Sequence, residues 1–542
     1  MRRWRLGGLI GVLLLLAAPL AVPLLELLGR LDRVAFLTDE TLVLGGNTLL
    51  LVGGTLALAL PAGVATAVLL YRTDLPLRKP LRGLTILALF VPLPVVCSAW
   101  QAALGTGGWL AFFSWSEAPG RFWPAGLWPA ILVHAVAALP WVVLIVGQGL
   151  RWVEGELEAD ALLAAGVWRV LWRVTLPRCR GVIGAAGLWV ALQTASEITV
   201  TDQMQVRSLA EEVYLELWQG GPDALARSTA ASLPVVLALA LLVFLALSRL
   251  ERALPPPESL LTAPPTFSLG WARWPCFALV LGGVLLLAGG TLGSLLWRAG
   301  ARGYPPSWSA QTAAGFLATA WEANAGTIIT SLLVALAAGG LTALVALLLC
   351  WLSLDARWFR WVTFALAAIL WALPAPVVGI GLKEAIMAIV DWWPAGPLAE
   401  ALYWSPSPVP VLCADLLRYL PCAVAVLWPM VRLLPGELRD SARVDGATPG
   451  QELRHVVWPL AARAALWSAL VVAALSLGEV GAVRMRVESG PPTFAHLLWE
   501  QMHRGVDNVV AALCLLMLAA VVAGAALLAL GGALLRLLRA RG

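Results

Sequence analysis

The sequence predicts an all-α polytopic membrane protein with about 12 transmembrane helices, arranged as two parallel six-helix repeats. Its composition is the first reason, because 60% of the 542 residues are hydrophobic and only 13% are charged. Soluble proteins carry about a quarter charged residues. Several apolar runs also exceed the roughly 20 residues that a helix needs to cross a bilayer. Finally, two polar stretches resemble each other at one fixed separation, which indicates two copies of one unit.

Each half of the chain contains six apolar segments that we expect to span the membrane. In the first half they cover residues 6–28, 41–70, 83–104, 127–150, 182–200 and 232–248. In the second half they cover residues 274–297, 325–353, 362–390, 408–431, 464–481 and 508–535. The first segment follows three arginines, as in a signal peptide, but its apolar run is long for one, which favours a retained span. Six spans per half give both halves the same orientation, so the repeat is parallel.

The distribution of basic residues predicts how the chain is oriented. If the N-terminus lies in the cytoplasm, most of the 37 lysines and arginines fall in segments on the cytoplasmic side. This bias is the usual determinant of membrane topology, so we expect both termini and both polar stretches in the cytoplasm.

The two polar stretches show the repeat most clearly. One reads EADALLAAGVWRVLWRVTLP and the other DSARVDGATPGQELRHVVWP. Aligned without gaps, equivalent positions are 282 residues apart: Glu158 and Asp440, Ala164 and Gly446, Pro177 and Pro459. Pairs outside the stretches keep the same spacing: Pro92 and Pro374, Pro94 and Pro376, Glu197 and Glu479. The chain is therefore expected to be a tandem duplication.

These stretches resemble the EAA loop of binding-protein-dependent ABC transporter permeases. The second keeps Ala442, Asp445, Gly446 and Pro459 of that pattern, but has Asp440 where the family has Glu. The first keeps Glu158, Ala159 and Pro177, but has Asp160 and Ala164 where the family has Ala and Gly. The tandem arrangement looks like the fused permeases of iron(III), thiamine and related small-solute importers.

The resemblance and the repeat together divide the chain into five regions. Residues 1–40 form an N-terminal span and outer loop, and 41–250 a first permease domain. Residues 251–324 hold a Pro-rich linker, the seventh span and an outer loop, and 325–535 form a second permease domain. Residues 536–542 form a basic cytoplasmic tail.

In the second loop, Thr448 followed by Pro449 reads as a helix N-cap and first helical residue. Glu452 is one residue too far along for a capping box, Gly446 permits a sharp turn, and Pro459 ends the loop and starts the next span. The resemblance implies that a short helix in each loop couples the chain to an ATPase subunit; the bland alternative is an ordinary cytoplasmic helical hairpin. The expected coupling residues are Glu158, Ala159, Ala164, Gly166, Trp168 and Pro177, with Asp440, Ala442, Asp445, Gly446, Thr448 and Pro459.

Ionisable residues inside spans are functional candidates because their burial in a membrane is costly. His134 and Asp415 both lie six residues before a mid-span proline, and Arg418 is one helical turn from Asp415, within pairing distance. We expect these three to line the translocation path, or else to form an ion pair and a satisfied core histidine. Glu197 and Glu479 end the fifth span of each half, where they act either near a gate or as helix-end hydrogen-bond partners.

The sequence thus predicts the permease subunit of an importer in the bacterial cytoplasmic membrane, with no cofactor, metal site or nucleic-acid partner. Lys79 is followed by Pro and Lys383 by Glu, so neither belongs to a Walker A loop, and the chain is not expected to be an enzyme. The expected partners are two ATPase subunits, a solute-binding protein and the lipid bilayer. Iron(III) is the first expectation for substrate and thiamine the next. The alternative is a secondary transporter with six-plus-six repeats, whose usual loop motif is absent from residues 71–82.

Overall fold

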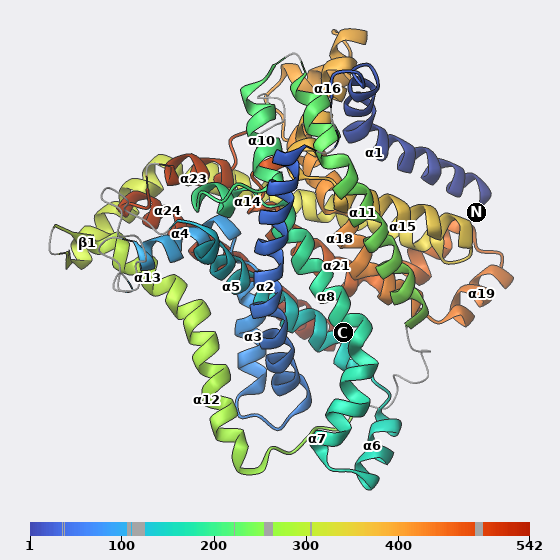
Figure 1. The fold of residues 1–542 in the computed structure, drawn as a ribbon. Helices are drawn as coiled ribbons and strands as arrows, with labels where there is room; N and C mark the ends of the chain where they lie inside the picture. Colours follow the sequence, from blue (N-terminus) through green and yellow to red (C-terminus); the bar gives the residue numbers. More distant parts are fainter. Residues whose placement is uncertain are drawn as a thin grey trace.

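The computed structural model describes residues 1–34, 36, 38–105, 110, 125–221, 223–253, 264–303, 306–482, 491–503 and 505–541, with side chains to residue 524 and at 526. Nearly all regular structure in these residues is helical (Figure 1). The β structure among them is a short antiparallel pair, β1 (Ala301–Arg302) with β2 (Ser307–Trp308). The predicted all-α class is confirmed.

The helices of the first half follow the predicted spans closely. They are α1 (Arg2–Leu28), α2 (Asp39–Arg72), α3 (Arg78–Ala88), α4 (Leu93–Leu104), α5 (Leu127–Gly149), η2 (Leu150–Trp152), α6 (Gly155–Ala164), α7 (Val167–Val170), η3 (Leu171–Thr175), α8 (Leu176–Ser196), α9 (Thr199–Gln203), α10 (Leu209–Gln219) and α11 (Ala224–Ala253).

The helices of the second half follow the same order. They are η5 (Gly270–Ala272), α12 (Arg273–Val284), η6 (Leu285–Gly289), α13 (Gly290–Gly300), α14 (Ala310–Ser353), α15 (Arg357–Ala372), α16 (Ala375–Trp392), α17 (Pro397–Ala399), η7 (Glu400–Trp404), α18 (Val409–Arg432), α19 (Gly436–Val444), α20 (Pro449–Glu452), η8 (Leu453–Val457), α21 (Trp458–Ser476), α23 (Phe494–Met502) and α24 (Asn508–Arg541).

Eight helices in the described residues are long and apolar enough to cross a membrane, and two bent helix pairs bring the number to ten. The bent pairs correct the prediction of continuous spans at 83–104 and 362–390. The pair α3–α4 bends by 99° and the pair α15–α16 by 107°. Each second helix is capped by a proline, Pro92 or Pro374. A residue before proline is biased away from helical geometry, and proline lacks the N–H that would continue the hydrogen-bond ladder.

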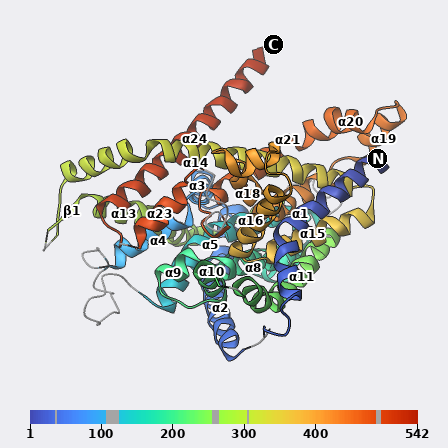
Figure 2. The same ribbon diagram turned by 90° about the horizontal axis from the view of Figure 1, so that it is seen from above.

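Equivalent helices pack in equivalent ways in the two halves. In the first half α2 packs against α5 and α8, and in the second α14 packs against α18 and α21. The first span of each half lies instead against the other half. Helix α1 packs on α16, α11 and α15, whereas α13 packs on α4 (Figure 2). This exchange joins the two halves through reciprocal helix contacts.

Two short segments recur with the same boundaries 282 residues apart. Helix α7 begins at Val167 and α20 at Pro449, and each continues through a five-residue π-helical segment, η3 or η8, into a long helix. Both segments belong to the polar stretches that the sequence singled out. Their identical spacing supports the duplication, whose domain boundaries remain a prediction.

Candidate functional site

The two polar loops project from the periphery of the protein. In Figure 1, α6 and α7 lie at the bottom and α19 at the right edge, both away from α10 and α23. Most of the twelve predicted coupling residues are exposed, among them Trp168 (66% exposed). Ala442 is intermediate, and Glu158 is fully buried. The loops therefore offer surfaces to a partner, but the side chain of Glu158 is not part of that surface.

The second loop folds locally as its sequence predicts, with one correction. Thr448 is the N-cap of α20, Pro449 is its first residue, and Gly446 has a φ of +80° in the turn that precedes it. That conformation is accessible to Gly at little cost. The sequence reading missed the capping box: the backbone N–H of Thr448 donates to Gln451 Oε1 at 2.8 Å. Gln451, and not Glu452, stands at the third helical position, where glutamine serves as well as glutamate.

The first loop has the same path with weaker caps. Gly166 is the N-cap of α7, as aligned, but it supplies no side-chain hydrogen bond. In both loops the expected boundary between a short helix and the next span is wrong, because the helix continues through Pro177 and Pro459 without a break. A proline removes one backbone donor, and the π-helical segment just before it accommodates the changed hydrogen-bond pattern. The short helix of each loop is thus rigidly continuous with the long helix that follows.

A buried ion pair ties the first loop to the C-terminal end of α2. Arg72 donates to Glu158, and both side chains are almost completely buried. Arg72 also donates to the carbonyl oxygens of Leu150 (3.0 Å) and Pro265 (3.1 Å), and Thr175 donates to Glu158 at 2.6 Å. We call the Arg72–Glu158 pair the first clasp.

A second network of opposite polarity ties the second loop to the residue that follows α14. Here Asp355 accepts from Arg439 (2.7 Å) and from Arg443, and the same two arginines donate to Glu452, each through Nε at 2.9 Å. Burial alone would raise the pKa of Asp355, but the two arginines outweigh it and hold the pKa below its usual value. We call the network of Asp355, Arg439, Arg443 and Glu452 the second clasp.

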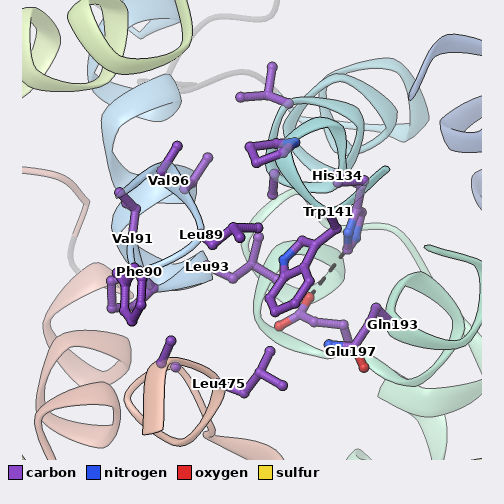
Figure 3. A pocket seen from close by; sticks show the side chains of 18 of the residues that line it. Leu89, Phe90, Val91, Leu93, Val96, His134, Trp141, Gln193, Glu197 and Leu475 are labelled. Atoms are coloured by element: carbon purple, nitrogen blue, oxygen red, sulfur yellow. Dashed lines mark ion pairs between the residues drawn. The ribbon is translucent and has the colours of Figure 1, made fainter. Parts of the chain in front are cut away.

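Between the two halves lies a cavity of about 290 Å³, which we call the chamber. It is lined by parts of α4, α5, α8, α13, α18 and α21, and by the bend between α3 and α4 (Figure 3). His134, Glu197, Arg418 and Glu479, four of the five predicted path residues, line it. The fifth, Asp415, is buried in α18 next to Ser476, which donates to it at 2.6 Å.

The polar groups of the second half bond mostly to one another across the chamber wall. The expected pairing of Arg418 with Asp415 is wrong, because Arg418 lies 3.7 Å from Glu479 instead and donates to Ser196 of the first half at 2.6 Å. Glu479 also accepts from the Tyr419 hydroxyl at 2.7 Å. These contacts give Arg418 and Glu479 a structural role at the junction of the halves.

The polar groups of the first half leave bonding capacity directed into the chamber. Glu197 accepts the backbone N–H groups of Thr199 (2.6 Å) and Val200 (2.9 Å), as a helix-end partner does, and its carboxylate also faces the cavity. His134 Nε2 is buried without a hydrogen-bond partner, 4.0 Å from Glu197 Oε2. Figure 3 shows both side chains beside Trp141 and Gln193.

A row of tryptophans separates the chamber from a second cavity of about 630 Å³. The ring centroids of Trp141 and Trp189 are 4.8 Å apart, and those of Trp189 and Trp371 are 5.5 Å apart. Trp141 and Trp189 line both cavities. Arg151 and Arg463 line the second one. The two cavities therefore lie in series.

Comparison with known proteins bears on the second half of the chain. Residues 354–541 match the family described as binding-protein-dependent transport system inner membrane component. Residues 354–541 form a permease domain of this family. The chain is also 43% identical to a trehalose transport system permease protein of Mycobacterium tuberculosis over 53 residues, which are 10% of this chain and 19% of that protein. This permease domain contains the second loop, and its helices fit an integral inner membrane protein.

Several residues of the site escaped the sequence reading. Arg72 and Asp355 were visible as charges at the end of an apolar run, which is a usable signal. Glu452 lay inside the second loop, but was considered only as a cap. Trp141 and Trp189 carried no signal, because tryptophans in an apolar span are ordinary. Only the packing of remote helices brings them together.

Proposed function

We propose that the chain is the membrane-spanning subunit of an ATP-driven importer and carries both permease domains. The observation that supports this most is the pair of exposed loops with identical backbone plans 282 residues apart, one of them inside the matched permease domain. Two equivalent loops are what two ATPase subunits would need. The chain acts as a non-enzymatic subunit, and ATP hydrolysis takes place on the partner.

The solute passes between the two halves through the chamber and the second cavity, which lie in series. An extracytoplasmic binding protein delivers the solute, and both termini lie in the cytoplasm. The curated relative is named for trehalose, whereas the tandem arrangement resembles iron(III) and thiamine importers. Uptake is therefore to be compared across iron(III), thiamine and trehalose, each with its own binding protein.

The test uses the full chain in proteoliposomes with a candidate ATPase subunit and binding protein. We expect uptake that depends on ATP inside the vesicle. Gly446→Val should strongly reduce ATPase binding and uptake, because a β-branched residue does not adopt a φ of +80° without strain. Gly436→Val is the matched control, since Gly436 has a negative φ and open space around its Cα.

Uptake driven by a proton gradient in vesicles without any ATPase would refute the importer and favour a secondary transporter. The same conclusion follows if Gly446→Val leaves both ATPase binding and uptake at the level of Gly436→Val.

A further inference from the structure

We propose that the His134–Glu197 side of the chamber binds a small organic cation bearing N–H donors, and that the importer carries solutes of this class. The inference rests on the proposed function and extends it to a substrate class. It follows from three features of the chamber: an unpartnered buried imidazole, an uncompensated carboxylate and adjacent aromatic rings.

The imidazole and the carboxylate form the first part of the site. His134 is only 4% exposed, and its Nε2 has no hydrogen-bond partner. Leaving such a group unpaired costs about 1–3 kcal/mol, so a bound group that completes it is favoured. The 4.0 Å between His134 Nε2 and Glu197 Oε2 is too long for a direct hydrogen bond. One ligand nitrogen fits between them at about 2.9 Å from each atom.

The charges around the chamber determine the sign of that ligand. Among the described residues that line it, the acids are Glu197 and Glu479, and Arg418 is the base besides His134. Arg418 is engaged by Glu479 at 3.7 Å, by Ser196 and by the carbonyl oxygen of Leu373 at 3.1 Å. Glu197 receives only backbone N–H groups and has no comparable cation. A carboxylate away from water is stabilised by a paired cation, and an anionic solute would be repelled.

The tryptophans provide the third part. Trp141 lies next to Glu197 in the chamber, and Trp189 packs against Trp141 (Figure 3). The face of an aromatic ring attracts cations by about 0.5–2 kcal/mol. The second half lacks these rings, because Val471 aligns with Trp189 and Cys422 aligns with Trp141. The structure therefore assigns one such site per chain, on the side of the first half.

Binding of the full chain in nanodiscs, without ATPase, tests this site. The probes are thiamine and agmatine as cations, trehalose as a neutral solute and succinate as an anion. We expect the cations to bind at least about tenfold more tightly than trehalose or succinate. Glu197→Gln should weaken cation binding about tenfold or more, because it removes the charge but keeps the shape. Trp141→Leu should weaken it severalfold.

Glu322→Gln, an exposed site in α14, is the control for loss of one carboxylate. Each variant is first checked for an unchanged melting temperature, and His134→Gln provides a second test if Glu197→Gln does not fold. Equal binding of trehalose and the cations would overturn the inference, as would an absence of cation binding or cation affinity that Glu197→Gln leaves unchanged.

ATPase association and ATP-dependent uptake are measured separately on the same preparations. A chain that imports trehalose with its ATPase keeps the proposed function and loses this inference. A chain that binds agmatine at Glu197 but no ATPase loses the proposed function instead.

Discussion

Arg72 and Asp355 hold nearly equivalent places, at the end of α2 and directly after α14, but they carry opposite charges. Each clasps the polar loop of its own half. Exchanged docking would bring Arg72 to Arg439 and Arg443, and Asp355 to Glu158. Like charges at close range disfavour wrong partners strongly. The opposite polarity therefore directs each loop of the duplicated chain to its own half.

The pKa of Asp355 makes the second clasp sensitive to acid. This pKa is held below its usual value of about 3.8, so the clasp contributes stability above that pH and loses it as pH falls through the folded-state pKa. We expect protease cleavage between α19 and α20 to stay slow from pH 5 to 8 and to accelerate below about pH 4. Asp355→Asn should already be cleaved rapidly at pH 7 and change little with acid. Equal rates for the two proteins at pH 7 would contradict this role.

Among elements, the first loop depends on one buried pair. Glu158→Arg places two guanidinium groups together away from water, and breaking a buried pair costs about 3–5 kcal/mol. We expect this variant to lose ATPase binding. The exchange Arg72→Glu with Glu158→Arg should restore part of it, because the pair is re-formed. Restoration is incomplete because glutamate cannot donate to the carbonyl oxygens of Leu150 and Pro265.

The control for this exchange is Glu154→Arg in the same loop. Its exposed partner Arg178 lies 3.6 Å away, and such surface pairs contribute about 0–1 kcal/mol. We expect nearly normal ATPase binding from this variant, measured by co-purification. If the double exchange binds no better than Glu158→Arg alone, the first clasp does not position the loop.

Local chemistry in the sequence was enough to predict the elements but not all of their breaks. Thr448, Pro449 and Gly446 specify a cap, a helix start and a turn, and each forms as expected. The apolar runs over 83–104 and 362–390 concealed bends at Pro92 and Pro374, because hydrophobicity alone does not distinguish a straight span from a broken one. Continuity of the loop helices with the next spans also escaped, since it depends on π-helical segments that no local pattern marks.

At the scale of the whole molecule, the chamber shows where sequence reasoning stops. His134 and Glu197 were identified by their charge in an apolar setting, and the fold brings them within 4.0 Å of each other. Arg418 was assigned to Asp415 because they share one helix face. Its contact with Glu479 lies across two helices, and its contact with Ser196 crosses between the halves. Such pairings follow from helix packing that one sequence does not specify.

The exchange of first spans joins the two halves, and a single glycine allows its closest approach. A Cβ at Gly381 of α16 would collide with the backbone of Pro19 in α1, whereas Gly340 of α14 faces open space. We expect Gly381→Leu to separate α1 from α16 and to cost about 1–3 kcal/mol, the usual range for overpacking. Gly340→Leu should cost much less. The measurement co-expresses residues 1–253 and 264–542 as two fragments and compares how much of each pair survives purification in detergent. The unaltered fragments should stay together because each contributes a helix to the other. If Gly381→Leu pairs survive as well as Gly340→Leu pairs, then α1 is an accessory span and the halves are held together elsewhere, for example by the Arg418–Ser196 contact.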